Sequence, residues 1–337
     1  MKKYDAVVVG AGPAGLKCSE TLAKTGKKVL VLEKDSIFGD KICAGGMTLK
    51  DFKLGIPSKI TDMKFKKVII HTPNQKTEVK QKNFFISTMD RKVLGKWMAE
   101  QAEKAGAEIR LNSCVKKIKN NHVVSGRDKI EFKYLIGADG SNSIVRKSLG
   151  FKDKDYAVAF QYITKKKFNN MELFFDYDKF GPGYAWIFPH GKYTSVGICS
   201  DSRNIRKRKL RKIFNSWCEK KFSTKKLELQ GGMIRYGYKG HKFGNKFLVG
   251  DAAGFASSFS GEGIYFAILS GIDVAKKISD KRYTCKNIEH ILNVKKIEDK
   301  IMEHWKKHKT LAEIEIEMIT FLSRSRWISK EIIDHFD

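Results

Sequence analysis

The stretch that decides the fold is Gly-Ala-Gly-Pro-Ala-Gly at residues 10–15. An apolar strand pattern at 4–9 precedes it, a helical pattern at 13–25 begins within it, and a second strand pattern at 28–32 follows. Glycines in this arrangement allow a tight turn and let the backbone approach a pyrophosphate, while the helix start offers N–H groups to phosphate charge. The order of strand, turn, helix and strand therefore predicts a dinucleotide-binding unit.

An acidic residue completes this unit. Glu33 directly follows the second strand pattern, where a carboxylate can accept hydrogen bonds from both hydroxyls of a nucleotide ribose. Because the acid, the strands and the glycine turn all occur in the expected order, a chance match is improbable. We therefore predict nucleotide binding.

Two further glycine-containing stretches bear on which nucleotide is bound. Gly-Asp-Ala-Ala-Gly at 250–254 follows a buried strand pattern at 246–249, and a helical pattern starts at Ile264. Asp251 is placed to hold a ribityl or ribose hydroxyl, and the helix start can face negative charge. Gly-Ala-Asp-Gly-Ser at 137–141 is the third stretch. Together, the three stretches resemble the flavoproteins of the p-hydroxybenzoate hydroxylase superfamily, in which these segments close over FAD. The resemblance implies FAD as the resident cofactor.

Two other segments narrow the resemblance. Cys-Ala-Gly-Gly at 43–46 and Tyr-Ala-Trp-Ile-Phe-Pro at 184–189 are similar to segments of the geranylgeranyl reductase family. Members of that family saturate isoprenoid double bonds in archaeal membrane lipids or in the chlorophyll side chain. They usually carry a pair of glycines beyond the aromatic segment, whereas this chain has Gly197 and then Cys199 in the second place. This departure concerns the fit of the substrate more than the binding of the cofactor.

The family pattern implies which residues contact FAD. They are, in chain order, Gly10, Gly12, Ala14, Gly15, Glu33, Cys43, Ala44, Gly46, Arg91, Val115, Asp139, Asp251, Gly263 and Ile264. Some of these have plainer interpretations: Arg91 as a solvated residue at a helix start, Val115 as a buried strand residue, and Cys43 as a small buried side chain. The six cysteines contain no CxxC pair or metal-ligand spacing, so we expect free thiols in a reducing cytoplasm and no metal site.

The aromatic segment predicts the substrate contacts. Tyr184, Trp186 and Phe188 alternate, so in a strand their side chains share one face. That face would form an apolar wall for a prenyl chain, with ordinary core packing as the alternative. The candidate catalytic residues are Tyr184 and Cys43, either of which could deliver a proton, and a water held near residues 45–46 is a third candidate donor.

The positions of the motifs predict an α/β fold in three parts. A Rossmann-like FAD-binding domain is assembled from segments 1–50, 85–150 and 235–280. An inserted antiparallel-sheet substrate domain comprises 51–84 and 151–234. A C-terminal helical segment covers 281–337, and its apolar positions recur at helical spacing between 287 and 322. We expect that apolar face to pack on the body of the protein, the alternatives being a membrane or a second subunit.

Net charge is the compositional outlier. The chain carries a formal charge of +29, with basic clusters at 165–167 and 203–212. Such clusters attract anionic membranes by about 1 kcal/mol per basic residue near the surface, although a lysine-rich solvated surface is an equally good interpretation. Aromatic residues are not interleaved with the basic runs, so nucleic acid is not expected as a partner. No apolar run approaches the roughly 20 residues of a membrane span, so we expect a cytoplasmic protein, peripheral at most to the cytoplasmic membrane face.

The resemblance implies an FAD-dependent oxidoreductase that reduces isolated C=C bonds of geranylgeranyl chains, on archaeal-type ether phospholipids, by hydride transfer from reduced flavin. The chain offers no second glycine-rich nucleotide unit, so the external electron donor stays open between NAD(P)H and a ferredoxin. Alternatives are an FAD-dependent aromatic or isoprenoid monooxygenase, a flavin halogenase as a weaker rival, and a flavin-bearing lipid carrier. The fate of the reduced flavin distinguishes these classes.

Overall fold

The computed structural model describes residues 2–152, 154–224 and 227–325. The chain divides into two compact units, each built from separate segments. The first unit comprises Met1–Lys41, Arg91–Tyr156 and Ile234–Glu298. The second unit comprises Ile42–Asp90, Ala157–Met233 and Asp299–Asp337.

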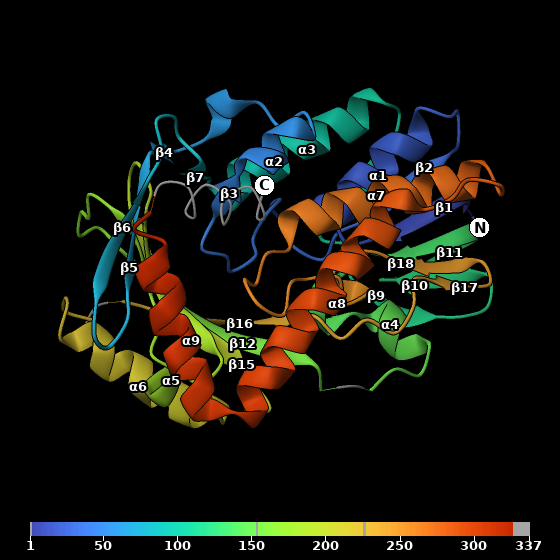
Figure 1. The fold of residues 1–337 in the computed structure, drawn as a ribbon. Helices are drawn as coiled ribbons and strands as arrows, with labels where there is room; N and C mark the ends of the chain where they lie inside the picture. Colours follow the sequence, from blue (N-terminus) through green and yellow to red (C-terminus); the bar gives the residue numbers. More distant parts are fainter. Residues whose placement is uncertain (1, 153, 225–226, 326–337) are drawn as a thin grey trace. The chain divides into compact units, whose positions relative to one another are not determined.

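The first unit is built on an eight-stranded sheet with the order β17-β18-β11-β1-β2-β8, to which β10 and β9 are added beside β11 (Figure 1). The central five strands run parallel: β1 (Lys2–Val9), β2 (Val29–Leu32), β8 (Glu108–Arg110), β11 (Asp128–Gly137) and β18 (Lys246–Leu248). The antiparallel additions are β9 (Val115–Ile118), β10 (His122–Ser125) and β17 (Lys242–Phe243). Because β1 is buried along most of its length, its near-continuous apolar sequence is that of a central parallel strand.

Helices cover this sheet. They are α1 (Pro13–Ala23), α3 (Arg91–Lys104), α4 (Ile144–Ser148), α7 (Ile264–Ser279) and the short 3₁₀ helices η2 (Gly140–Asn142) and η3 (Gly250–Ala252). α1 packs against both α7 and α3, and α1 and α7 lie side by side in Figure 1. Proline at the first position of α1 suits a helix start, because the missing N–H has no partner there in any helix. The predicted strands and helices around the glycine turn are confirmed within one or two residues.

The second unit contains a seven-stranded sheet with the order β16-β12-β15-β14-β13-β5-β6. Its strands are β5 (Lys67–His71), β6 (Lys76–Lys80), β12 (Tyr156–Thr164), β13 (Met171–Phe174), β14 (Gly183–Pro189), β15 (Thr194–Asp201) and β16 (Gln230–Arg235). The pairs β12–β15, β14–β15, β13–β14 and β5–β6 are antiparallel, as predicted, whereas β5 and β13 run parallel. The parallel pair arises because β5 comes from a separate, earlier segment of the chain, so no hairpin sets its direction.

A smaller sheet and several helices complete the second unit. The sheet joins β3 (Gly46–Thr48), β7 (Ile86–Thr88) and β4 (Met63–Phe65) in that order. The helices are α2 (Leu49–Lys53), η1 (Ser58–Ile60), α5 (Tyr177–Phe180), α6 (Lys207–Glu219) and α9 (Lys309–Leu322), while α8 (Lys286–Lys307) starts in the first unit and ends in the second. The α/β fold class, with a Rossmann-like unit, a mainly antiparallel second unit and C-terminal helices, is confirmed.

Several stretches group differently from the segments expected from the sequence. Residues 42–50 and 85–90, which were expected beside the glycine turn, cluster with the second unit. The reason is strand pairing, because β3 and β7 belong to one small sheet. Residues 281–298, expected in the C-terminal segment, and the stretch 151–156, expected in the substrate domain, cluster with the first unit.

The expected packing of the C-terminal apolar face is only partly correct. Met302 and Trp305 of α8 are buried, but the exposed apolar side chains include Ile297 and Ile301 of α8 and Leu311, Ile314, Met318 and Phe321 of α9. The residues that α9 buries instead are Ala312, Ile316 and Thr320. The periodicity identified which residues share a face, but it could not identify which side of the helix meets the sheet. Residues 326–337 of the predicted segment lie outside the described residues.

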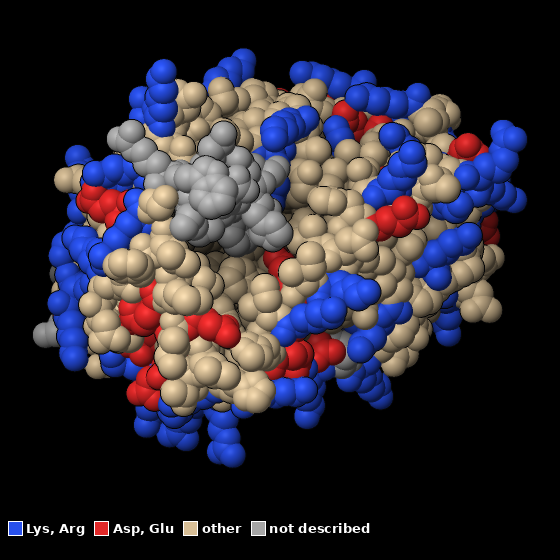
Figure 2. Space-filling model, in the orientation of Figure 1, with Lys and Arg blue, Asp and Glu red and all other residues tan. Residues whose placement is uncertain are grey.

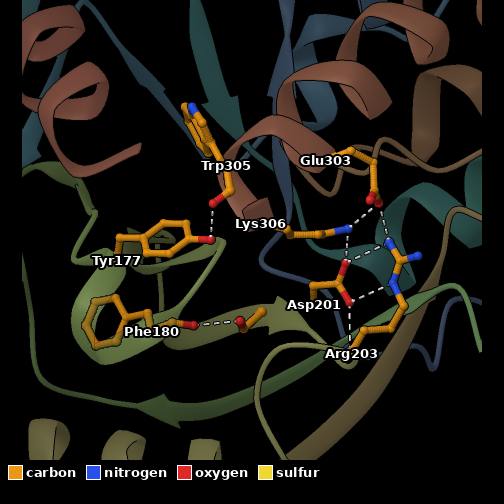
Figure 3. Close-up of polar contacts among 8 residues, drawn as sticks. Tyr177, Phe180, Asp201, Arg203, Glu303, Trp305 and Lys306 are labelled. Carbon is orange, nitrogen blue, oxygen red and sulfur yellow. Dashed lines mark hydrogen bonds and ion pairs between the residues drawn. The ribbon is translucent and has the colours of Figure 1, made fainter. Parts of the chain in front are cut away.

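Polar contacts hold the end of α8 against the second sheet (Figure 3). The carboxylate of Asp201, at the end of β15 and 2% exposed, lies 2.6 Å from Lys306 Nζ and 3.3 Å from Arg203 Nη2. Arg203 Nη2 also lies 2.9 Å from Glu303 Oε1. Beside this cluster, the Tyr177 hydroxyl donates a hydrogen bond of 2.7 Å to the Trp305 carbonyl, and burial raises the pKa of the phenol.

We expect Tyr177→Phe to lower the free energy of unfolding by about 1–2 kcal/mol, because it removes the buried hydrogen bond from the Tyr177 hydroxyl to the Trp305 carbonyl. Urea denaturation of the full chain measures this change. The matched control is Tyr156→Phe, since Tyr156 is half-buried and no hydrogen bond of its hydroxyl is described. If both variants lose the same free energy of unfolding, the Tyr177 hydrogen bond does not itself stabilise the fold.

Candidate functional site

The predicted nucleotide-binding residues of the first unit gather at one edge of its sheet. β1, β2, β11 and β18 run parallel, so their carboxyl ends lie on the same side. The residues that follow these ends are Gly10, Glu33, Ala138 and Val249. Open α/β sheets bind ligands beyond the carboxyl ends of their strands, and the three glycine-containing stretches meet at this edge.

The glycine turn is shaped by two different requirements. Gly10 has φ of +102°, and a Cβ there would lie 2.5 Å from the Ala138 carbonyl oxygen, so the turn itself requires glycine. A Cβ at Gly15 would lie 2.1 Å from the Gly10 carbonyl oxygen, so α1 approaches the turn too closely for a side chain. Gly12 is different: its φ is −77°, and a Cβ there would meet no atom within 4 Å. The protein does not need glycine at residue 12, and the space beside it suits a ligand at the start of α1.

Glu33 is fixed beside this turn. Its carboxylate accepts hydrogen bonds from the Ala11 N–H at 2.6 Å and from the Asp35 N–H at 3.0 Å. Ala14 is buried in the first turn of α1. Val115 is buried in β9, and its contact with a nucleotide stays a prediction.

Asp251 lies at the same edge, in η3. Its buried carboxylate oxygen Oδ2 accepts a hydrogen bond of 2.9 Å from the Ser141 hydroxyl and lies 2.7 Å from Lys41 Nζ. Gly263, the residue before α7 and Ile264, is close enough that a Cβ there would lie 3.2 Å from Asp251 Oδ1. The structure thus brings together the predicted residues Asp251, Gly263 and Ile264. Lys41 was missed, because it is an ordinary loop lysine in the sequence.

Asp139, in the third stretch, makes hydrogen bonds at the start of α4. Its carboxylate accepts hydrogen bonds from the Ser143 hydroxyl at 2.5 Å and from the Ile144 N–H at 2.6 Å, at the start of α4. Burial raises the pKa of this carboxyl group. The Arg146 guanidinium then joins this stretch to the 250–254 stretch by donating to the carbonyls of Ala252 and Ala253, both at 3.2 Å. Contact between Asp139 and a cofactor stays a prediction.

Arg91 provides the clearest sign of an anionic ligand. It is the first residue of α3 and is 9% exposed. Within the part of the chain that the structure describes, neither Nε nor Nη1 of its guanidinium has a hydrogen-bond partner. Leaving buried donors unpaired costs about 1–3 kcal/mol for each group. A guanidinium is well suited to pair with phosphate oxygens, so Arg91 and the open space at Gly12 both fit a dinucleotide.

The second unit holds the remaining predicted residues. The segment Cys43–Gly46 contacts the end of β14: a Cβ at Gly46 would lie 2.9 Å from Phe188 Cε2. The Gly45 N–H donates to Cys43 Sγ at 3.4 Å, and Gly45 has φ of +77°. Cys43 is half-buried. The cysteine segment and the aromatic strand, which are far apart in the sequence, are therefore neighbours in this unit.

The aromatic residues of β14 form a continuous row. The rings of Tyr184 and Trp186 are 6.1 Å apart, and those of Trp186 and Phe188 are 6.4 Å apart. Trp186 and Phe188 are buried, with the Trp186 indole N–H donating to the Ser195 hydroxyl at 3.0 Å, whereas Tyr184 is half-buried. The shared face is as predicted, and contact with a substrate stays a prediction for all three.

The departure from the family's glycine pair has a structural explanation. Gly197 is opposite Trp186 across the β14–β15 pair, and a Cβ there would lie 2.1 Å from Trp186 Cζ2. Cys199 is opposite Tyr184, and burial raises the pKa of its thiol to about 11. Glycine is therefore needed only beneath the larger indole, and the second position accommodates a cysteine side chain.

Comparisons with known proteins bear on both units. Residues 3–282 match the family described as "FAD binding domain". Geranylgeranyl diphosphate reductase of Rhodobacter capsulatus is 30% identical over 80% of this chain and 73% of its own length. Digeranylgeranylglycerophospholipid reductase 2 of Methanosphaera stadtmanae is 29% identical over 93% of this chain and 88% of its own length. The crystal structure of a geranylgeranyl bacteriochlorophyll reductase-like protein from Thermoplasma acidophilum matches 99% of this chain and 95% of its own, with a TM-score of 0.80 and 25% identity.

Proposed function

Because the chain belongs to the geranylgeranyl reductase family of FAD-binding proteins, we propose that it reduces isolated C=C bonds of geranylgeranyl chains on archaeal-type ether phospholipids. The predicted family, the FAD cofactor and the oxidoreductase class are confirmed by the matches. The observation that carries the proposed substrate is the aromatic row of β14 beside the Cys43–Gly46 segment. The phospholipid class is supported by the relative named for such a lipid, which matches 93% of this chain.

The residues of the first unit fit FAD. Arg91 would pair with the pyrophosphate, and the N–H groups beside Gly12 would also face it. Glu33 would accept from ribose hydroxyls, and Asp251 from a ribityl hydroxyl. Bound FAD, once reduced by an external donor, supplies a hydride. We propose NAD(P)H or a ferredoxin as that donor.

The residues of the second unit would bind the alkene and position a proton beside it. An isolated alkene is a poor hydride acceptor, so a proton must be held in position at its other carbon. We propose that the proton is held at Tyr184 Oη or Cys43 Sγ, which are both half-buried. Trp186 and Phe188 would exclude water and orient the prenyl chain through their apolar rings.

Oxygen consumption distinguishes this proposal from a monooxygenase. We expect the FAD-loaded protein, supplied with a reductant and geranylgeranyl phospholipid in an oxygen electrode, to show no lipid-dependent increase in oxygen uptake. The lipid recovered should gain hydrogen and no oxygen in its mass spectrum. Lipid-dependent oxygen uptake with incorporation of an oxygen atom would instead establish the monooxygenase.

We also propose peripheral contact with anionic membranes through the second unit. No described helix is both long enough and apolar enough to span a bilayer. Ile314 and Met318 on α9 are 57% and 52% exposed, and a run of exposed basic residues at 206–209 lies at the start of α6. Lys and Arg side chains are also spread over the face drawn in Figure 2. An apolar helix face combined with basic charge is typical of proteins that bind at a lipid surface.

We expect the double variant Ile314→Ser, Met318→Ser to bind anionic phospholipid vesicles about fivefold more weakly, because less apolar area enters the lipid. Vesicle sedimentation measures the affinity. Val93→Ser is the matched control, since Val93 is an apolar residue of the first unit that is 44% exposed. An unchanged affinity in the double variant would exclude α9 from the contact.

A further inference from the structure

His190 lies directly after β14, and its ring is enclosed within the second unit. The side chain is 2% exposed. The ring stacks on Tyr193 with centroids 4.4 Å apart and an interplanar angle of 15°. The Tyr193 hydroxyl in turn donates to Asp90 Oδ2 at 3.1 Å, and burial raises the pKa of this hydroxyl. These contacts hold the imidazole in one plane.

Both ring nitrogens of His190 face oxygen acceptors. Nε2 lies 3.0 Å from the Ala44 carbonyl oxygen, and Nδ1 lies 2.6 Å from Asp62 Oδ2. A carbonyl oxygen can only accept, so Nε2 must carry a proton. The short contact between Nδ1 and the Asp62 carboxylate fixes the rotation of the ring. The hydrogen bond to Ala44 therefore comes from a ring that Asp62 orients.

The segment that receives this hydrogen bond contains Cys43. Gly45 lies so close to the imidazole that a Cβ there would be 2.7 Å from His190 Cε1. The Gly45 N–H donates to Cys43 Sγ, so the position of the thiol follows that of the Ala44–Gly45 peptide. We propose that His190, oriented by Asp62, is a positioning residue that fixes the Cys43–Gly46 segment and thereby the Cys43 thiol. The use of that thiol in alkene reduction rests on the proposed function.

Two amide substitutions at residue 190 test this proposal. In His190→Gln the side-chain nitrogen reaches about as far as Nε2, so the bond to Ala44 can be kept. In His190→Asn the nitrogen reaches only as far as Nδ1, so the contact with Asp62 can be kept while the bond to Ala44 is lost. We expect the rate of iodoacetamide alkylation at Cys43 of the FAD-loaded protein to rise about tenfold in His190→Asn, since the hydrogen bond that fixes the Ala44 carbonyl is lost. We expect it to rise less than about twofold in His190→Gln.

Internal and matched controls make the readout specific. Peptide mass spectrometry also measures the alkylation of Cys114, which is exposed in the first unit, in the same reaction. The alkylation rate of Cys114 should be the same in all variants. His71→Asn is the matched variant, because it removes a 2.6 Å contact between His71 and Glu172 in the second unit. An unchanged Cys43 rate in His190→Asn, or equal increases in the Asn and Gln variants, would overturn the proposal.

Activity then separates this inference from the proposed function. If the lipid is reduced, we expect His190→Asn to lower kcat about tenfold and His190→Gln to restore most of it, with a smaller effect on KM. If no variant or wild-type protein reduces the lipid, the proposed function fails, while the alkylation result still decides the role of His190. Lipid reduction that is equally fast in all variants would contradict a positioning role in the reaction.

Discussion

Replacing Gly12 by Asp is expected to weaken FAD binding by at least about a hundredfold without destabilising the FAD-free protein. A carboxylate at residue 12 would occupy the open space at the start of α1 and oppose the charge of the pyrophosphate. The protein itself tolerates the change, because a Cβ there meets no atom within 4 Å and the backbone has an ordinary φ of −77°. Aspartate is also a better residue than glycine before a helix, since its carboxylate accepts from the first N–H groups.

Two titrations measure these opposite effects. Quenching of flavin fluorescence gives the FAD affinity, and urea denaturation of the FAD-free protein gives the free energy of unfolding. Gly191→Asp is the matched control, because Gly191 also has open space around its Cβ position and no positive φ. Normal FAD affinity in Gly12→Asp would show that the pyrophosphate does not approach this turn.

Arg91→Met is expected to lower FAD affinity by about 10- to 100-fold, the range for losing a hydrogen-bonded charge. The FAD-free protein should be as stable as wild type or more stable. The reason is that Nε and Nη1 of the buried guanidinium have no hydrogen-bond partner among the described residues, so methionine removes a desolvation cost while keeping the apolar stem.

The same two titrations apply, with Arg127→Met as the control. Arg127 is an exposed arginine of the first unit, so its loss changes the net charge equally without removing a buried group. A fall in stability with unchanged FAD affinity in Arg91→Met would assign Arg91 a structural role. Equal losses of FAD affinity in Arg91→Met and Arg127→Met would mean that only the net charge matters.

The local signals in the sequence predicted most of the first unit. The shape of the turn at residues 10–15 depends mainly on local contacts. Gly10 and Gly15 are required by contacts within the same strand–turn–helix unit and with Ala138. The helix that starts at Ile264 and the strand before Asp251 were also predictable, since apolar periodicity changes at a glycine-rich loop between them. These elements depend on residues that are near one another in the chain.

Contacts between distant residues were not predictable. Lys41 and Asp251 are separated by 210 positions, and His190 and Asp62 by 128. No periodic pattern links such pairs, and each residue alone has an ordinary surface interpretation. The sequence offered one signal for His190, which is its position directly after the aromatic strand. The role of His190 becomes visible only from its contacts with the Ala44 carbonyl and the Asp62 carboxylate in the structure.

In the C-terminal helices, the contacts of the apolar residues were likewise not predictable from the sequence. The spacing correctly indicated α8 and α9, and Met302 and Trp305 are buried as expected. Leu311 and Phe321 are nevertheless 47% and 57% exposed. Helical spacing defines a face, whereas the partner of that face depends on where the sheet of the second unit lies.

The central claim is that hydride from reduced FAD reaches an isolated double bond of a geranylgeranyl chain. Anaerobic single turnover tests it most directly: the FAD-loaded protein is reduced with dithionite, mixed with geranylgeranyl phospholipid, and followed by flavin absorbance and lipid mass together. We predict that the lipid gains two hydrogens for each double bond reduced, in step with flavin reoxidation. A flavin that stays reduced until air is admitted, with the lipid mass unchanged, would contradict the claim.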